Sequence, residues 1–458
     1  MRHFSPSDRP LKIAVVGSGI AGLSAAWLLS QRHDVTVFEA DSRIGGHCHT
    51  VDTGEARVDT GFIVYNDTTY PNLSALFSHI GTSTKVSDMS FAVSMDEGAL
   101  EYSGSSLSGI FAQRRNVASP RFWSMLRDLV RFYRAAPQDV RNIAQATSLD
   151  EYLDSAGYGR ALREDHLYPM AAAIWSTPAV EIGNYPAESF IRFCENHGLL
   201  KLFRRPVWRT VDGGSSAYVE KLIAPFRDSI RVDAPVTGIR RVSGAVQIST
   251  PGAEPEWFDD VVIGAHADQA LRMLADASQE ERRLLGAFTY GRNETLLHTD
   301  SALMPKRRAV WSSWNYLAQS ARTGAGVNAR GMRKPCVTYW MNRLQRISDT
   351  TPLFVTLSPA TPPAPEKVIW SGIYEHPLYN AQTLEAQSRL WSLQGMRNTW
   401  FCGSYFGSGF HEDAIQAGLA VAESLGGVRR PWTVQGESDR IHLRHHAEPV
   451  AEPTSIER

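Results

Sequence analysis

Histidine and carboxylate side chains that stand next to each other are the residues of this sequence best suited to moving a proton. His411 and Glu412 are adjacent in the run GFHED, which begins at Gly409. His298 and His376 stand in other segments rich in polar and aromatic residues. An imidazole exchanges a proton near neutral pH, so each could act as a general base, or it could be a structural residue satisfied by hydrogen bonds. We take His411, Glu412 and His298 as the catalytic candidates.

Four tryptophans accompany these polar groups: Trp175, Trp311, Trp314 and Trp340. Large aromatic rings can line a tunnel for an acyl chain, surround a cationic amine or fill an ordinary core. The sequence leaves these three roles open.

The elements that must position such groups begin with a glycine-rich turn. Residues 12–16 form a β-branched run, and a G-x-G-x-x-G pattern follows directly and opens an apolar helix. A second strand ends at Glu39, 22 residues after Gly17, where an acidic side chain can bind ribose hydroxyls. Strand, turn and helix in this order favour a dinucleotide with its pyrophosphate at the helix N-terminus. The expected contacts are Gly17, Ser18, Gly19, Ala21, Gly22, Glu39 and Ala40.

The next residues resemble a flavoprotein superfamily. The pattern R-x-G-G at 43–46 resembles the second phosphate motif of flavin amine oxidases and phytoene desaturases, and residues 58–63 are similar to their stretch passing the flavin ring. The resemblance implies FAD as the cofactor. It further implies FAD contacts at Arg43, Gly45, Gly46, His47, Gly61, Phe62 and Ile63. His47 stands where the family usually has arginine, and we interpret His47, Cys48 and His49 as loop residues, with no metal site.

Later segments carry the same resemblance. Residues 212–214 are similar to the family's glycine pair before a helix, and 231–236 resemble its adenine-contacting strand. Residues 259–266 are like the buried strand after which the chain leaves the domain, and 400–418 resemble the closing FAD motif. Ser404 stands where the family has an acid. The implied contacts are Val236, Gly403, Ser404, Asp413, Ala414 and Ile415.

The closing motif also has a consequence for catalysis. In the family it ends in a helix whose N-terminal amides face the flavin, so the resemblance places His411 and Glu412 beside the flavin as candidate bases.

The resemblance implies an α/β, two-lobed fold of the amine oxidase type. A Rossmann-like FAD domain of discontinuous segments is accompanied by a mixed-sheet substrate domain. A polar, proline-containing stretch without periodicity at the end predicts a flexible tail. The expected bounds are 9–85, 205–275 and 385–430 for the FAD domain, 86–204 and 276–384 for the substrate domain, and 433–458 for the tail.

A closer resemblance runs from about residue 10 to 425. The segments GGHCHT, IWSTP, NHGLL, NETLLHTD, SWNY, TYWMN, HP and GFHED, in that order, look like a bacterial flavoprotein family commonly encoded beside cyclopropane-fatty-acid-synthase-like methyltransferases. That family includes the flavin-dependent desaturase of methylated furan fatty acid synthesis. The resemblance implies oxidation of a modified lipid acyl chain and a lipid methyltransferase as a partner.

Composition bounds the remaining classes. The 458 residues suffice for two domains, and 47 basic against 48 acidic residues leave a net charge of −1, which argues against nucleic acid as a partner. The four cysteines form no C-x-x-C pair, so neither a disulfide framework nor a zinc site is expected. No apolar run reaches 18 residues, and we expect a cytoplasmic protein.

Residues 114–134 raise the question of the inner face of the membrane. They hold six arginines and one acid, with apolar residues at helical spacing and Arg127, Arg131 and Arg134 on another face. Such a helix can rest on anionic lipid beside an acyl-entry channel, or it can be an ordinary surface helix with a basic face.

The sequence thus favours an FAD-dependent dehydrogenase or desaturase of a modified fatty acyl chain of phospholipid, with hydride transfer to flavin N5. One alternative is a flavin amine oxidase. The lysine that assists many such enzymes would be Lys306, Lys334 or Lys367, and none stands in a recognisable motif. The other alternative is a non-catalytic flavoprotein partner of a lipid methyltransferase.

Overall fold

The computed structural model describes residues 9–141, 143, 147–175, 182–196, 198–201, 205–318, 336–359 and 361–443. The side chains of Trp175 and Asn196 lie outside this description, as do Lys334 and residues 444–458 of the expected tail. The chain divides into two units. Unit 1 comprises Met1–Ser42, Asp228–Ala287 and Gln382–Arg458, and unit 2 comprises Arg43–Arg227 and Phe288–Ala381.

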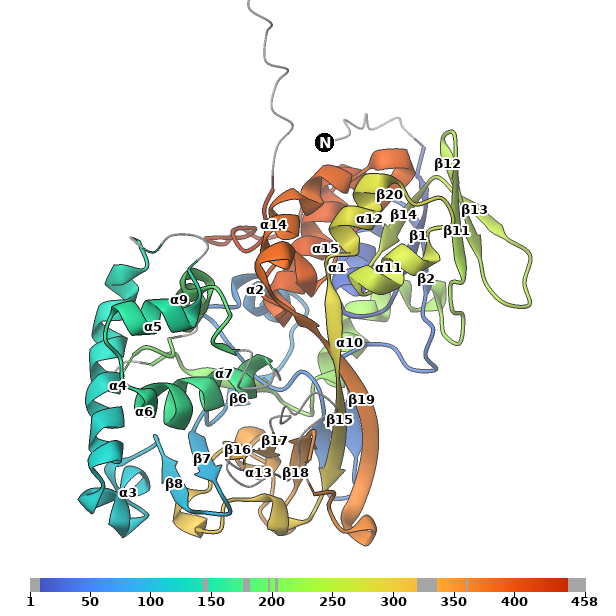
Figure 1. Ribbon diagram of the computed structural model, residues 1–458. Helices are drawn as coiled ribbons and strands as arrows, with labels where there is room; N and C mark the ends of the chain where they lie inside the picture. The colour runs from blue at the N-terminus through green and yellow to red at the C-terminus, as the bar shows by residue number, and fades with distance from the viewer. Residues whose placement is uncertain are drawn as a thin grey trace, which may run out of the picture. The chain divides into compact units, whose positions relative to one another are not determined.

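A five-stranded parallel sheet forms the centre of unit 1 (Figure 1). Its strands are, in spatial order, β10 (Ile230–Arg231), β2 (Asp34–Phe38), β1 (Lys12–Val16), β14 (Asp260–Ile263) and β20 (Thr399–Phe401). The central strands are continuous apolar runs because a parallel sheet is covered on both faces. The predicted strand over 12–16 is therefore confirmed. Residues 231–236 form a strand only as far as Arg231, and Val236 lies in the connection to β11, because Pro235 has no N–H to donate to a ladder.

Helices α1 (Ile20–Leu29) and α15 (His411–Gly426) pack against each other in unit 1. All ten residues of α1 are buried. A Cβ on Gly418 of α15 would overlap the carbonyl oxygen of Ala21 and the hydroxyl of Ser24, so glycine is what allows the two helices to approach this closely. The other elements of the unit are the meander β11 (Gly238–Val242), β12 (Ala245–Ser249) and β13 (Glu256–Phe258), and the helices α11 (Ala267–Met273), α12 (Gln279–Leu285) and α14 (Ala381–Leu390).

Unit 2 contains a seven-stranded mixed sheet. The long strands β15 (Thr289–His298) and β19 (Val368–Leu378) run side by side as an antiparallel pair (Figure 1). The sheet continues through β18 (Phe354–Leu357), β17 (Cys336–Trp340), β16 (Trp314–Ala318), β7 (Phe91–Met95) and β8 (Leu100–Ser103). Only the β16 and β7 pair is parallel among these described strands. The expected α/β fold with parallel and mixed sheets is confirmed.

Smaller elements complete unit 2. Strands β5 (Tyr65–Asn66), β9 (Trp208–Val211) and β6 (Thr84–Val86) form one sheet, and β3 (Thr50–Asp52) pairs with β4 (Arg57–Asp59). The helices are α2 (Pro71–His79), α3 (Leu107–Ile110), α4 (Pro120–Asp139), α5 (Leu149–Ser155), α6 (Arg160–Leu162), α7 (Tyr168–Trp175), α9 (Ala187–Asn196), α10 (Ser216–Ile223) and α13 (Met341–Leu344). Within the described ranges, no helix has both the length and the apolar character to cross a bilayer.

The two units differ from the expected domains in two segments. Residues 43–85 and 205–227, expected in the FAD domain, pack with unit 2. Each unit consists of residues that share a core, and a division by shared core need not follow a division by ligand binding. The assignment of these segments to an FAD domain stays a prediction.

The start of the expected tail is folded, contrary to the sequence prediction. Ile441 is buried, and Trp432, directly before the expected tail, stacks on Trp27 with the ring centroids 5.7 Å apart. The Gln416 amide of α15 accepts the backbone N–H of Arg440 at 3.1 Å. These contacts involve side chains distant in sequence, so local periodicity carries no signal for them.

Candidate functional site

The glycine-rich turn joins β1 to α1 in unit 1. Gly17 has φ +98°, which favours glycine, and its N–H donates to the carbonyl of Phe38 at 2.8 Å. A Cβ on Gly22 would overlap the carbonyl oxygen of Gly17, whereas a Cβ on Gly19 would meet no atom within 4 Å. The fold therefore requires Gly17 and Gly22. Gly19 instead leaves open the side from which a pyrophosphate approaches the backbone.

Glu39 is held beside this turn. Its Oε2 accepts the backbone N–H of Ser18 at 2.8 Å and the hydroxyl of the same residue at 2.5 Å. Its Oε1 accepts the N–H of Asp41 at 2.9 Å. The carboxylate is thus fixed at the end of β2, where a ribose-binding acid is expected. Of the two other residues expected at the nucleotide, Ala21 is buried in α1 and Ala40 is exposed.

The closing motif begins at the end of β20 and continues into α15. Gly403 and Ser404 follow β20, and Ala414 and Ile415 are buried in α15. Asp413 accepts the N–H of Phe410 at 2.7 Å and so satisfies the first turn of the helix. Burial raises the pKa of Asp413, and the nearby Arg440 opposes this rise.

The two candidate bases occupy the first turn of α15. Burial lowers the pKa of His411 to about 3, so its imidazole is neutral at physiological pH. The same shift makes it a weaker base than an exposed histidine. Glu412 is fully buried, and its Oε1 accepts the side-chain amide of Gln416 at 3.1 Å. The structure therefore brings both candidates to the same end of one helix.

The second glycine loop belongs to unit 2. Gly45 and Gly46 both have positive φ, at +118° and +57°. The carbonyl of His47 accepts the N–H of Phe62 at 2.8 Å, and a Cβ on Gly61 would overlap that same carbonyl oxygen. The loop and the stretch Gly61, Phe62 and Ile63, which the sequence placed at the phosphates and the flavin ring, therefore lie against each other.

Arg43 provides a test of the fit to a phosphate-containing cofactor. Its NH1 nitrogen is buried and has no hydrogen-bond partner among the described residues. A buried cationic donor without an acceptor is costly unless a ligand supplies one. The open face at Gly19 in unit 1 and this guanidinium nitrogen in unit 2 each fit a phosphate-containing cofactor.

Side chains of β19 lie against the second glycine loop. The ring of His47 is 4.9 Å from that of Tyr374 and 5.6 Å from that of His376. The Tyr374 hydroxyl is 2.7 Å from the Thr60 hydroxyl, which is 2.9 Å from Nδ1 of His49. The sequence named His376 and this loop separately, and the structure brings them together.

His298, the third catalytic candidate, lies within the large sheet of unit 2. Its Nδ1 accepts the N–H of Asp300 at 3.0 Å, and its Nε2 is 2.7 Å from the hydroxyl of Thr356 on β18. The side chain is fully buried, and burial lowers its pKa to about 4. Both ring nitrogens are thus occupied within the sheet, which leaves neither to take a proton from a substrate.

Trp311, Trp340 and Trp314 of unit 2 pack against other side chains of the protein. Arg308 places its guanidinium carbon 3.7 Å from the ring centroid of Trp311 and 4.7 Å from that of Trp340. Trp314 packs edge-on against Tyr339 with the centroids 4.7 Å apart. The protein's own cation therefore occupies the faces of the pair Trp311 and Trp340, which we call the tryptophan cage.

The buried carboxylates of unit 2 are also paired. Each of the five among its described residues accepts hydrogen bonds from protein groups: Asp59 from Ser215, Glu101 from Arg307, Asp128 from Gly159, Asp165 from Arg121, and Asp300 from Ala364. Lys367 pairs with Asp300 at 3.0 Å, and Lys306 is 3.6 Å from Glu97. These carboxylates are thus already engaged by donors within the protein.

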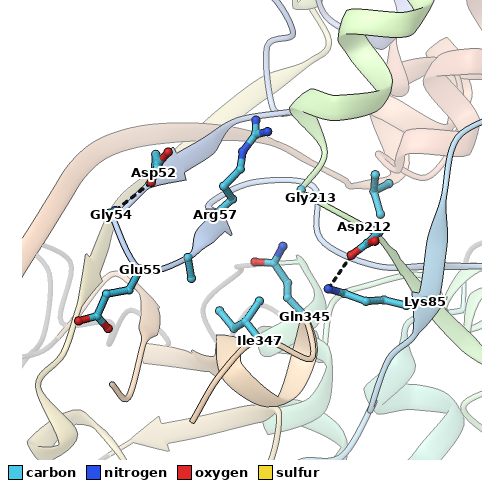
Figure 2. A pocket seen from close by; sticks show the side chains of 12 residues that line it. Asp52, Gly54, Glu55, Arg57, Lys85, Asp212, Gly213, Gln345 and Ile347 are labelled. Carbon is cyan, nitrogen blue, oxygen red and sulfur yellow. Dashed lines mark hydrogen bonds and ion pairs between the residues drawn. The ribbon is translucent and has the colours of Figure 1, made fainter. Parts of the chain in front are cut away.

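A surface pocket of about 420 Å³ lies next to Asp59 in unit 2 (Figure 2). Lys85 and Asp212 form an ion pair of 2.9 Å at its side, and Gln345 lines it. Gln345 accepts the N–H of Asp59 at 2.8 Å and donates to its carboxylate at 2.9 Å. The pocket is lined by charges of both signs, so it does not match an apolar substrate.

Three groups escaped sequence reasoning. Arg308 fills the tryptophan cage, Gln345 holds Asp59, and Arg440 lies 3.3 Å from Asp413. None stands in a motif. A lone arginine or glutamine has no spacing that reports its partner, so no sequence signal was available.

A parallel sheet with a glycine turn after its first strand and an acid at the end of its second strand defines a dinucleotide-binding protein. The chain belongs to the flavin-containing amine oxidoreductase family, which matches residues 20–295. It is therefore an FAD-dependent oxidoreductase of this family, and the predicted cofactor, FAD, is confirmed.

Curated relatives match over a short segment. L-amino-acid oxidase of Mus musculus is 53% identical over 45 residues, which are 10% of this chain and 7% of the relative. Protoporphyrinogen oxidase 2 of Arabidopsis thaliana is 54% identical over 41 residues, 9% of this chain and 8% of the relative. The chain thus spans less than a tenth of the length of either relative in these matches.

Solved structures match over nearly the whole chain. A CLA-producing fatty acid isomerase from P. acnes has a TM-score of 0.66 and 18% identity, covering 92% of this chain and 100% of that one. A putrescine oxidase has a TM-score of 0.64 and 14% identity, covering 91% and 98%. At these identities the likeness shows the shared fold.

Proposed function

We propose that this oxidoreductase is a dehydrogenase, or desaturase, of a methylated or otherwise modified fatty acyl chain of phospholipid. The observation that carries the proposal is the position of Arg308 over Trp311 and Trp340, because a cage filled by the protein's own cation has no place for an ammonium group. The pairing of the buried carboxylates in unit 2 supports the same choice. An uncharged hydrocarbon substrate needs neither group.

The core of unit 2 suits such a substrate. Val58 and Ile63, which flank the stretch expected at the flavin ring, belong to one buried apolar cluster with Tyr339 and Leu357 of the large sheet. Trp314 and Trp370 pack against that cluster and are partly buried. A fatty acid isomerase has the same fold, and its name gives a fatty acid as its substrate.

The proposed roles of the residues follow from their environments. FAD, when bound, supplies the acceptor for two electrons from a substrate C–H bond. His411 is the first candidate for accepting the proton that the substrate releases, and Glu412, next to it in the first turn of α15, is the second.

The test is an anaerobic visible spectrum of the flavin-loaded protein before and after addition of phospholipid with methylated unsaturated acyl chains. We expect loss of the oxidised-flavin absorbance and a lipid product lighter by two hydrogens. The His411→Ala variant should keep its flavin and lose turnover, and normal turnover by that variant would reject His411 as the base. Oxidised flavin that persists with lipid would contradict the acyl-chain proposal.

The amine oxidase alternative has a matched arm in the same experiment. Putrescine oxidase shares the fold, so putrescine and other amines are added to a second sample. Reduction of the flavin by an amine and not by lipid would establish that alternative. Reduction by neither would favour a flavoprotein that is not catalytic and binds a lipid methyltransferase. We propose a lipid methyltransferase as the partner of the active enzyme as well.

A further inference from the structure

Three large apolar side chains stand exposed within 17 residues of unit 2. Leu107, Val117 and Trp123 are 77%, 54% and 49% exposed. The indole N–H of Trp123 donates to the carbonyl of Val117 at 2.8 Å, and its ring packs 5.4 Å from that of Phe111. Phe111 in turn donates its N–H to the carbonyl of Leu107 at 3.1 Å. We call Leu107, Val117 and Trp123 the apolar patch.

The apolar patch is supported by a rigid base. The ring of Phe111 lies 6.1 Å from that of Phe122, which is buried and 5.5 Å from Tyr102. Ser106 caps α3 and Ser119 caps α4 through side-chain hydrogen bonds to backbone N–H groups. Capped helices on a packed core hold the patch at the surface, so its exposure is not that of a frayed end.

Two exposed arginines lie in the same segment as the apolar patch. Arg114 and Arg115 lie in the turn η1 (Arg114–Ala118), directly before α4, and both are exposed. Among the described residues Arg114 has no ion pair, and Arg115 contacts only the carbonyl of Gly98, at 3.5 Å. Arg121, by contrast, is paired with the acids Glu164 and Asp165 of its own unit.

Several apolar residues of the expected membrane helix are buried. In α4 the residues Phe122, Met125 and Phe132 are buried in unit 2, because they pack on its other helices. Arg131 lies 4.1 Å from the ring centroid of Tyr158. Arg127 and Arg134 stay exposed along α4, whereas the exposed large apolar side chains lie at and before its N-terminal end.

We propose that the apolar patch, with Arg114 and Arg115, docks on an anionic lipid surface. Leucine, valine and tryptophan side chains enter the boundary between headgroups and acyl chains, and tryptophan favours that depth because its ring is amphipathic. The two guanidinium groups match the negative charge of the headgroups. This surface goes beyond the proposed activity, and its test requires no turnover.

The experiment is co-sedimentation of the full chain with phosphatidylcholine vesicles, with and without phosphatidylglycerol. Binding to the anionic vesicles is expected at about 0.01 M salt and a large loss at about 1 M, where the Debye length falls from about 30 Å to about 3 Å. The double variant Leu107→Ser and Trp123→Ser should bind the anionic vesicles at least about tenfold more weakly than the wild type. The matched control is Trp257→Ser, which removes a tryptophan of similar exposure, 48%, from unit 1.

A second measurement places the patch itself. The four native cysteines are all buried, so a Leu107→Cys variant can be labelled selectively with an environment-sensitive dye. The dye should shift to shorter emission wavelength with anionic vesicles, and the same dye at Trp257→Cys should not. Absence of binding, or binding equal in the double variant and the wild type, would overturn the proposal. A dimer that the double variant loses, without vesicle binding, would assign the patch to a second copy of the chain and also overturn it.

Discussion

Asp59 accepts a hydrogen bond of 2.7 Å from the backbone N–H of Ser215 and so ties the end of β4 to the start of α10. The same carboxylate accepts the hydroxyl of Thr50 at 2.6 Å and the amide of Gln345 at 2.9 Å. Asp59 stands two residues before Gly61. One buried acid therefore holds four segments of unit 2 around the stretch expected at the flavin ring.

Replacement of this acid should destabilise the fold. Asp59→Asn puts an amide donor among groups that all donate, and we expect the free energy of unfolding to fall by about 1–3 kcal/mol, the cost of unsatisfied buried polar groups. Urea unfolding of the two proteins measures it. The control Asp52→Asn changes an exposed residue and should stay within about 0.5 kcal/mol of wild type. Equal losses in both variants would contradict the role of Asp59.

The pH dependence of the same pair of proteins is a separate prediction. Burial raises the pKa of Asp59 to about 6, above the unfolded value of about 3.9. Between these values the folded chain binds more protons at this residue than the unfolded chain, so its contribution to the free energy of unfolding falls as pH rises. The stability advantage of wild type over Asp59→Asn should therefore shrink from about pH 4 to about pH 6. An advantage that grows with pH in urea titrations would refute this.

Two glycines of the nucleotide turn should separate ligand binding from folding. Gly19→Ala meets no protein atom, so we expect the apoprotein to keep its stability within about 0.5 kcal/mol. Its dissociation constant for FAD should rise about tenfold or more, because the methyl group lies where the pyrophosphate approaches. Gly22→Ala should instead unfold at lower urea concentration even without FAD, because its Cβ overlaps Gly17. Unchanged FAD affinity in Gly19→Ala would contradict the assignment.

The histidines should divide by role. His298→Ala should lower the free energy of unfolding by about 1–3 kcal/mol, because Asp300 and Thr356 lose their buried partner. Its kcat per bound flavin should stay within a factor of about two of wild type. His411→Ala should show the reverse pattern, with turnover lost and flavin retained. A loss of kcat in His298→Ala that matches the loss in His411→Ala would refute this division.

The ordered start of the C-terminal segment should matter for flavin retention. Arg440 lies 3.3 Å from the buried carboxylate of Asp413, in the first turn of α15. Arg440→Ala leaves that acid without its cation, so we expect weaker retention of FAD, measured as a lower temperature of flavin release. The control Arg240→Ala removes an exposed arginine from β11. Identical release temperatures in all three proteins would show that Arg440 does not support α15.

The local features of the nucleotide site could be predicted from the sequence. The order strand, glycine turn and helix over residues 12–29 depends on β-branched runs, on glycine at Gly17 and on helical periodicity, which are properties of neighbouring residues. Glu39 could be placed because the length of one strand–helix–strand unit fixes its distance along the chain. The family motifs further predicted FAD and the mixed sheet. They could do so because each motif is a contiguous stretch of sequence.

The tertiary structure decided which distant side chains meet. Asp59 and Gln345 are 286 positions apart, and their hydrogen bonds depend on how the large sheet of unit 2 closes over β4. Packing likewise placed Arg308 over the tryptophan cage and gave both ring nitrogens of His298 hydrogen-bond partners in the protein. Periodicity reports which face of an element is buried, and it carries no information about which side chain lies opposite. The cofactor could therefore be predicted from the sequence. Whether a candidate side chain is already hydrogen-bonded within the protein depends on contacts that form only in the folded chain.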